Sequence, residues 1–284
     1  MCNCGGNIEM ADVRTNFNVK VSIIMGIYNC AATLPAAVES ILEQTYDNWE
    51  LIMCDDGSDD NSYEVAQNIA KRFPEKIILL KNEYNMRLAA TLNRCLKYAR
   101  GEYVARMDAD DISMADRLET QIKFLENNPE YACVGSNMII FDEKGEHGER
   151  VMPEKTKKAT LLKTTIFAHP TIMMKRSVYQ KLGGYTVSKS TMRAEDLDLW
   201  FRFVHAGYKG YNIQRPLYKY RESEKDLKKR SLRVAFQTSK VFLNGYKLLG
   251  FSKIQYVYAF RPIIVALLPD RLICKYHTGT QVIQ

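Results

Sequence analysis

Two aspartates one residue apart, Asp108 and Asp110, have the most clearly defined chemistry in this sequence. They follow the apolar run Tyr103–Met107, which reads as a buried strand, so both carboxylates are expected on the loop after it. Carboxylate oxygens are ligands that suit Mg²⁺ or Mn²⁺, and a bound diphosphate would supply further oxygens. The pair therefore predicts a divalent metal site. A solvated acidic turn that caps the following helix is the alternative for the pair taken alone.

Two further polar clusters follow apolar runs in the same way. Asp55 and Asp56 come after Trp49–Cys54, and Tyr28 comes shortly after Val21–Met25. A carboxylate at a strand end can accept a hydrogen bond from a base N–H or a ribose hydroxyl, and an aromatic ring there can stack on a nucleobase. Helix capping and an ordinary surface tyrosine are the corresponding structural alternatives.

A third acidic pair, Glu195 and Asp196, opens a predicted helix over Glu195–His205. The helix dipole favours carboxylates in a first turn, so a purely structural role is possible for both. A transferase that acts at a hydroxyl nevertheless needs a general base, and a carboxylate can fill that role.

Apolar runs alternate with helical patterns through the first half of the chain. The predicted strands are Val21–Met25, Trp49–Cys54, Ile77–Leu80 and Tyr103–Met107. This alternation is typical of an α/β protein with a mostly parallel sheet and flanking helices. Ligands of such sheets bind beyond the carboxyl ends of the strands, so the polar clusters are expected to share one rim.

The second half is less regular. Strands are predicted at Tyr131–Phe141 and Thr171–Met174, a helix at Ser177–Leu182, and a polar, loop-rich segment at Glu143–Lys158. The 284 residues are enough for one large α/β domain with an appendage.

The C-terminal part differs from the rest in charge. From Arg221 to the end there are 12 basic and 4 acidic residues, whereas the preceding part is nearly neutral. Apolar residues at helical spacing alternate with lysines and arginines there, and the apolar segment Ile254–Leu268 is too short to span a bilayer. These features favour a basic amphipathic tail that lies on a membrane surface. A helical hairpin packed on the domain or on a second subunit is the alternative.

The cellular location is predicted from what the sequence lacks. The seven cysteines are odd in number and irregularly spaced, which is unlike a disulfide-stapled secreted domain. The first residues show no basic start followed by an apolar run, so no signal peptide is expected. We therefore expect a cytoplasmic protein, placed by its tail at the inner face of the cell membrane.

Taken together, these motifs resemble family 2 of the glycosyltransferases, which have the metal-dependent, Rossmann-like fold known as GT-A. The resemblance covers roughly Val19 to Arg221. It rests on the order and spacing of five segments: Val21–Asn29, Trp49–Ser58, Asn85–Asn93, Gly101–Leu118 and Ala194–Trp200.

The resemblance implies a role for each motif. Tyr28, flanked by Ile27 and Asn29, looks like the residue that packs on uracil, and Asp56 looks like the uracil-binding aspartate, with Asp55 beside it. Asp110 matches the direct metal ligand, whereas Asp108 matches a residue that contacts the ribose or the metal. Asp196 matches the catalytic base, with Glu195 next to it. The cofactor implied is Mn²⁺ or Mg²⁺.

The sequence also departs from the family pattern. Arg87 stands where many members have glycine and others have an arginine near the nucleotide, so Arg87 is a candidate contact to the uracil or a phosphate. His169, before the predicted acceptor-side strand, is a candidate for the sugar pocket, although a lone histidine is more often structural. The Gln-x-x-Arg-Trp motif of processive synthases is absent, which favours transfer of single sugars.

The expected activity is an inverting transfer of one hexose or N-acetylhexosamine from a nucleotide-diphosphate sugar to an acceptor hydroxyl. The resemblance implies a uridine-linked donor. The expected acceptor is a saccharide or a lipid-linked saccharide, as in surface-polysaccharide or glycolipid assembly. A sugar-nucleotide pyrophosphorylase would need a Gly-rich phosphate loop after the first strand, where Tyr28-Asn29-Cys30-Ala31 stands instead. A nucleic acid is not an expected partner, because the apolar stripes of the tail suit a membrane better than phosphate tracking. A degenerate transferase acting as a scaffold is disfavoured by the intact acidic set.

The expected organisation has three parts. They are a loose lead-in over residues 1–18, a GT-A domain over 19–221 with a nucleotide-binding half (19–115) and an acceptor half (116–221), and a helical basic tail over 222–284.

Overall fold

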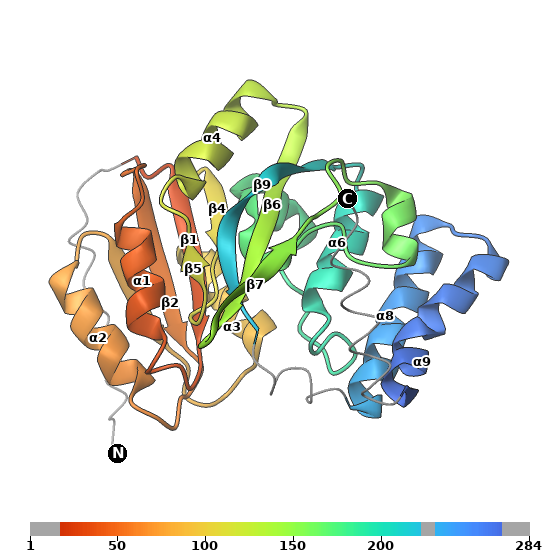
Figure 1. Ribbon diagram of the computed structural model, residues 1–284, viewed down its shortest axis with the longest axis horizontal. Coiled ribbons are helices and arrows are strands. Elements are labelled where there is room, and N and C mark those ends of the chain that lie inside the picture. Colours follow the sequence, from red (N-terminus) through yellow and green to blue (C-terminus); the bar gives the residue numbers. More distant parts are fainter. Residues whose placement is uncertain (1–17, 223–230, 269–284) are drawn as a thin grey trace, which may run out of the picture.

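The computed structural model describes residues 18–222 and 231–268, so the predicted lead-in lies almost wholly outside the described residues. One sheet of nine strands runs through this part of the chain, in the order β3-β2-β1-β4-β8-β6-β9-β5, with β7 paired to β6 (Figure 1). The strands are β1 (Val21–Ile27), β2 (Trp49–Asp55), β3 (Ile77–Lys81), β4 (Tyr103–Arg106), β5 (Ile112–Ser113), β6 (Tyr131–Asp142), β7 (Gly145–Arg150), β8 (Met173–Lys175) and β9 (Lys209–Arg221).

Helices cover both faces of this sheet. The α-helices are α1 (Leu34–Leu42), α2 (Ser62–Arg72), α3 (Leu88–Tyr98), α4 (Arg117–Asn127), α5 (Arg176–Leu182), α6 (Glu195–His205), α8 (Leu232–Leu249) and α9 (Arg261–Leu267). The 3₁₀-helices are η1 (Lys158–Leu162), η2 (His169–Thr171) and η3 (Lys253–Phe260).

The N-terminal half of the sheet has the parallel pairing that the sequence predicts. β1 lies between β2 and β4, and β3 pairs with the outer side of β2, all in parallel. β1 and β2 are buried along almost their whole length, as expected of strands covered on both faces. Val21, Ile23 and Met25 pack on one face and Ile24 on the other, so the alternating side chains of one strand belong to two hydrophobic cores.

The second half of the sheet is mixed. β8 is antiparallel to both β4 and β6, whereas β6 and β9 run parallel. The prediction of a loop-rich segment at Glu143–Lys158 is wrong for β7, whose residues are nearly all exposed. A strand without an apolar face has no periodic signal, and β7 forms because the edge of β6 is available for pairing. β9 was not predicted either.

Two groups of helices enclose the sheet. α1, α2 and α4 pack on the face that carries Val21 and Ile23, and α3, α5 and α6 pack on the opposite face with Ile24. α3 and α6 thus both pack on the face that carries Ile24.

The described part of the C-terminal tail is helical, as predicted, and it packs on the domain. Phe242 and Tyr246 of α8 meet Phe201 of α6 edge-on, with ring centroids 6.0 Å apart in each pair. Gly245 permits this contact, because a Cβ there would lie only 2.3 Å from the Phe201 ring. α9 folds back on α8, so the structure contains the helical hairpin that was the alternative to a purely membrane-bound tail (Figure 1). No described helix is long and apolar enough to cross a membrane.

Candidate active site

A cavity of about 1440 Å³ lies beyond the carboxyl ends of β1, β2 and β4. Its walls come from the loops after these strands, from residues 85–89, from 186–193 before α6, and from the end of β9. Eight of the predicted site residues line it: Ile27, Tyr28, Asn29, Asp56, Arg87, Asp108, Asp110 and Glu195. Asp55, His169 and Asp196 are not among the lining residues.

The loop after β1 presents an aromatic ring to the cavity. Tyr28 is 45% exposed, whereas Asn29 next to it is tied to the loop after β2. The Asn29 N–H donates to Ser58 Oγ (3.1 Å), and Asn29 Oδ1 accepts from the Asp59 N–H (2.9 Å). Asn29 also has a positive φ of 49°, a conformation that asparagine tolerates better than most residues. Asn29 therefore fixes the loop, and the Tyr28 ring remains available to a planar ligand.

The two aspartates after β2 have different surroundings. Asp55 is fully buried, and its carboxylate accepts hydrogen bonds from the N–H (3.2 Å) and the hydroxyl (2.6 Å) of Ser58. It holds the turn and does not reach the cavity. Helix capping does not explain these aspartates either, because α2 begins at Ser62 and its N-cap residue is Asn61.

Asp56 binds the neighbouring loop. Its carboxylate accepts from the N–H groups of Met86 and Arg87 and from Asn82 Nδ2, each at 2.8 Å. Gly57 has a φ of +69°, and a Cβ there would lie 2.9 Å from the Tyr84 carbonyl carbon, so a glycine is needed for this close approach. Asp56 therefore lines the cavity at the point where two loops are joined.

Arg87 lies on the same wall with an unusual backbone. Its φ is +75° and its ψ is 159°, a region that residues other than glycine rarely adopt. This conformation explains in physical terms why glycine suits the position. The hydrogen bond from the Arg87 N–H to Asp56 holds the arginine in place, and the residue lines the cavity.

The loop after β4 contains a cluster of three aspartates. One carboxylate oxygen from each of Asp108, Asp110 and Asp111 lies within 4.8 Å of the others. Asp108 forms an ion pair with the buried Arg106 (2.6 Å), and Asp110 is exposed on the cavity wall. Asp111 is fully buried and accepts from the Arg221 N–H (2.7 Å).

This cluster fits a hard divalent cation. The second oxygen of Asp111 is buried without a hydrogen-bond partner among the described residues. Burial raises the pKa of Asp111 well above its ordinary value, and the charges of Asp108 and Asp110 raise it further. Converging carboxylates of this kind repel one another unless a proton or a cation lies between them, and oxygen ligands suit Mg²⁺ or Mn²⁺.

The acidic pair Glu195 and Asp196 stands at the start of α6. Glu195 lines the cavity, whereas Asp196 Oδ1 accepts a hydrogen bond from the Leu197 N–H (2.7 Å). Burial raises the pKa of both carboxyl groups. For Asp196 the positive charge of Arg106 opposes the effect of burial. A carboxylate with a raised pKa is a better proton acceptor, which is the property that a general base requires.

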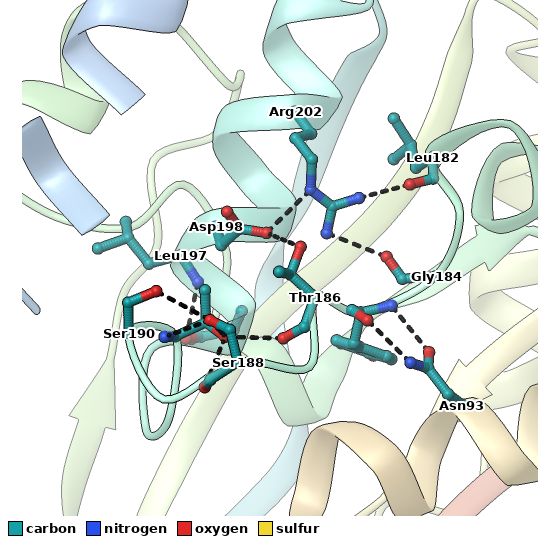
Figure 2. Close-up of polar contacts among 12 residues, drawn as sticks. Asn93, Leu182, Gly184, Thr186, Ser188, Ser190, Leu197, Asp198 and Arg202 are labelled. Carbon is teal, nitrogen blue, oxygen red and sulfur yellow. Dashed lines mark hydrogen bonds and ion pairs between the residues drawn. The ribbon is translucent and has the colours of Figure 1, made fainter. Parts of the chain in front are cut away.

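The segment before α6 is fixed by a network of side chains (Figure 2). The Arg202 guanidinium donates to Asp198 Oδ2 (2.9 Å) and to the carbonyls of Leu182 (2.6 Å) and Gly184 (3.0 Å). The Thr186 hydroxyl donates to the same Asp198 oxygen (2.6 Å). α6 therefore positions both Glu195 and the wall that precedes it.

His169 lies behind the cavity wall. It is 7% exposed, its Nε2 is 2.9 Å from the Tyr185 hydroxyl, and its ring meets Trp200 edge-on. Burial lowers the pKa of His169 well below its ordinary value, and the nearby Arg106 lowers it further. The structure thus assigns His169 to packing beneath the site, which departs from its expected place on the wall of a sugar pocket.

Arg221 is the main cavity residue that was not predicted. Its Nε donates to the Asp110 carbonyl (3.0 Å), and its side chain lines the cavity beside the acidic cluster. It reaches this place at the end of β9, 111 residues after Asp110. Pairing of β9 with β6 and β5 decides this position, and no local motif marks it.

Comparison with known proteins agrees with this arrangement. Residues 22–183 match the sequence profile described as Glycosyl transferase family 2. The chain belongs to this family. It is 44% identical over 262 residues to the putative glycosyltransferase EpsE of Bacillus subtilis, covering 92% of this chain and 94% of that protein. It is 36% identical over 190 residues to WfgD of Escherichia coli, described as UDP-Glc:alpha-D-GlcNAc-diphosphoundecaprenol beta-1,3-glucosyltransferase, covering 65% and 69% of the two chains.

Solved structures show the fold of this family 2 glycosyltransferase. The mannosyltransferase PcManGT from Pyrobaculum calidifontis, solved with GDP-Man and Mn²⁺, superposes with a TM-score of 0.62 at 19% identity, covering 93% of this chain and 81% of that one. Staphylococcus aureus TarS (residues 1–349) with UDP-GlcNAc gives a TM-score of 0.60 at 16% identity, covering 89% and 83%. The predicted GT-A fold is therefore confirmed.

Proposed function

We propose that this glycosyltransferase transfers a single sugar from a uridine-diphosphate sugar to a hydroxyl of a lipid-linked saccharide, with inversion at the anomeric carbon. The observation that supports this most directly is the cavity itself. It brings together an aromatic ring, an aspartate tied to main-chain N–H groups, a three-aspartate cluster and the acidic start of α6.

The donor would bind against the β1, β2 and β4 loops. The Tyr28 ring is exposed to stack on the base, and Asp56 keeps acceptor capacity for a base N–H beyond its three hydrogen bonds. Arg87 and Arg221 both line the cavity, and in this proposal they contact the base or the phosphates. Asp108 is held by Arg106, which favours a role toward the ribose or as a secondary metal ligand.

The acidic cluster would hold Mn²⁺ or Mg²⁺, with Asp110 as the exposed ligand and Asp111 as the buried one. A bound cation of this kind neutralises charge on the nucleoside-diphosphate leaving group. Arg221, which donates to the Asp110 carbonyl, orients the loop that carries these carboxylates.

The proposed chemical step rests on the acidic pair at the start of α6, where Asp196 matches the catalytic base by resemblance. Asp196 takes the proton from an acceptor hydroxyl, and the acceptor oxygen forms a bond to the anomeric carbon. The bond from that carbon to the diphosphate oxygen breaks, and the electron pair leaves with the nucleoside diphosphate. Attack occurs on the face opposite the leaving group, so the configuration inverts. Glu195 lines the cavity, and in this proposal it contacts the acceptor sugar.

A membrane-bound acceptor is favoured by the helical hairpin. Most of the exposed large apolar side chains of the described residues lie there: Leu232, Phe236, Leu248, Ile254, Val257, Tyr258, Phe260, Ile264 and Leu267. Arg233, Lys240, Lys247, Lys253 and Arg261 lie among them. Apolar and basic side chains on one surface suit the boundary of an anionic bilayer. Relatives named for a diphosphoundecaprenol acceptor are consistent with this assignment.

The activity is tested by a screen of nucleotide sugars for Mn²⁺-dependent release of the nucleoside diphosphate. We expect release with a uridine-linked sugar, and loss of metal-dependent nucleotide binding in Asp110→Ala. Titration heats that are the same with and without Mn²⁺ in the wild-type protein would contradict the metal assignment. Release only with guanosine-linked sugars would contradict the assignment of the base.

Membrane contact is tested separately by vesicle flotation. The protein is expected to float with vesicles that contain phosphatidylglycerol and less with phosphatidylcholine alone. The double variant Ile254→Ser, Ile264→Ser should float less in both cases, since both side chains are exposed. A wild-type protein that stays with the unbound fraction would remove this part of the proposal.

A further inference from the structure

The cavity wall formed by residues 186–193 contains two cations that the donor does not need. Lys189 and Arg193 are both exposed and both line the cavity. Within the described residues, neither side chain forms an ion pair that would neutralise it. In the proposed function the donor diphosphate is bound at the acidic cluster beside Arg221, which belongs to other segments of the cavity wall. These two cations are therefore available to a second anionic ligand in the same cavity.

This wall is built in a defined conformation. The Thr191 hydroxyl donates to the Thr186 carbonyl (2.7 Å), and the Thr191 N–H donates to the Ser188 hydroxyl (3.2 Å). Arg193 has a positive φ of 63°, which a residue other than glycine adopts only when its surroundings hold it there. The segment thus has internal contacts that fix where its two cations point.

The wall is joined to the C-terminal hairpin. Gln237 Nε2 of α8 donates to the Lys189 carbonyl (2.9 Å). In Figure 1 the beginning of α8 lies beside the segment that precedes α6. An apolar ridge begins at this contact, formed by Leu232 (45% exposed) and Phe236 (59% exposed), which share one face of α8 at a spacing of four residues. Cations on the cavity wall are therefore followed by exposed apolar side chains outside it.

We infer that Lys189 and Arg193 bind the diphosphate of a polyprenyl-diphosphate-linked acceptor and that the Leu232–Phe236 ridge contacts the adjoining lipid. This assignment rests on the proposed function, in which the acceptor is lipid-linked. A short acceptor places its diphosphate close to the hydroxyl that reacts, so the cations must lie near the base. Arg193 precedes Asp196 by three residues, which meets this requirement. Arg and Lys bind phosphate through charge-assisted hydrogen bonds, and the order of cation and then apolar surface matches the order of diphosphate and then lipid.

The kinetic test compares two acceptors that carry the same sugar. One is GlcNAc joined through a diphosphate to farnesol, and the other is GlcNAc joined directly to octanol. The double variant Lys189→Met, Arg193→Met is expected to raise KM for the diphosphate acceptor by about tenfold or more. KM for the octyl glycoside and for the donor should stay within about twofold, a change of under half a kcal/mol. Lys181→Met, at an exposed lysine of α5 outside the cavity wall, is the matched control.

A binding test keeps the inference falsifiable if no sugar is transferred. Farnesyl diphosphate and inorganic pyrophosphate are titrated in EDTA with UDP present, so that the metal-dependent diphosphate site does not contribute. The wild-type protein should bind farnesyl diphosphate more tightly than pyrophosphate. The Lys189→Met, Arg193→Met variant should bind both ligands more weakly, whereas Phe236→Ser should weaken only the binding of farnesyl diphosphate. Unchanged binding of farnesyl diphosphate in the double variant overturns the inference. An equal rise in KM for both glycosides also overturns it. A donor screen without turnover, together with the expected binding results, would instead count against the proposed function alone.

Discussion

The two sides of the cavity are held in different ways. On the nucleotide side, carboxylates and amides of Asp56 and Asn29 bond to main-chain N–H groups of neighbouring loops, next to fully buried strands. On the acceptor side, the wall before α6 is held by hydroxyl and guanidinium side chains such as Thr186 and Arg202 (Figure 2). The first side is anchored to the ends of fully buried strands. The second side is anchored to one helix by partly buried side chains, which bond to one another and to main-chain carbonyls.

Under the proposed function, this difference would let one fold combine a constant donor site with variable acceptors. A loop fixed to buried strands presents its ligand groups at nearly constant positions, because the strands themselves cannot shift without loss of core packing. A wall that is a loop held by partly buried side chains outside the sheet can change its sequence at lower cost in stability. We therefore expect substitutions on the two sides to separate into donor and acceptor effects.

The largest effect is expected at Asp196, the proposed general base at the start of α6. Asp196→Asn removes the proton acceptor and should lower kcat by about 10²- to 10⁴-fold, while nucleotide binding stays unchanged. Rates with saturating substrates and titration of the nucleoside diphosphate measure the two quantities. Glu195→Gln is the matched variant, since Glu195 lines the cavity directly, and it should lose less. The reverse order of the two losses would transfer the role of base to Glu195.

A smaller effect is expected on the donor side from Asp56→Ala. The N–H groups of Met86 and Arg87 and the amide of Asn82 would lose their acceptor. Each unmet donor costs about 1–3 kcal/mol when buried, so both the free energy of unfolding and the nucleotide affinity should fall. Urea unfolding and nucleotide titration measure these changes. Normal stability with normal nucleotide affinity would show that this loop is not held as the structure indicates.

The pH dependence of kcat tests which carboxylate of the acidic pair is the general base. Burial raises the pKa of Asp196, so the base stays protonated to a higher pH than an ordinary aspartate, whose pKa is about 3.9. Activity should therefore appear only above this raised pKa and fall about tenfold for each pH unit below it. The acidic limb of a kcat profile measures this, and the limb should persist in Glu195→Gln. A limb that disappears in that variant would contradict the assignment.

The smallest effect is expected on the acceptor side from Thr186→Val, which removes the hydroxyl bonded to Asp198. A hydrogen bond of this kind contributes about 1 kcal/mol, so KM for the acceptor should rise by roughly fivefold. KM for the donor should be unaffected, because this hydroxyl donates to Asp198 of α6 and not to the loops after β1, β2 or β4. Thr164→Val, at an exposed threonine outside the active-site cavity, serves as the control. Equal changes in both KM values would show that the two sides are coupled.

The predicted elements of the first half agree closely with the structure. Strands buried on both faces give continuous apolar runs, which a single sequence displays without help from partners. The exposed strand β7 and the long strand β9 lack such a run, and their formation depends on pairing with β6. Arg221 was missed for the same reason, because pairing of distant strands alone places it beside Asp110.

The predicted site residues also divide into those that the sequence located and those whose position only the folded structure shows. Tyr28, Asp56, Asp108 and Asp110 were located because they follow strands, and the carboxyl ends of parallel strands meet at one rim. Residue type and spacing did not reveal which aspartate of a pair faces the cavity. Asp55 points into its own turn, and only the hydrogen bonds of the folded loop show this.

The sequence by itself determined the α/β order, the rim at which the acidic groups gather and the family to which the chain belongs. These depend on local periodicity and on motif order, which are properties of the chain alone. The tertiary structure decided the burial of His169, the position of Arg221, and the contact of Gln237 with the wall before α6. Each of these depends on segments far apart in the sequence, and their packing is fixed only when the sheet and its two layers of helices form together.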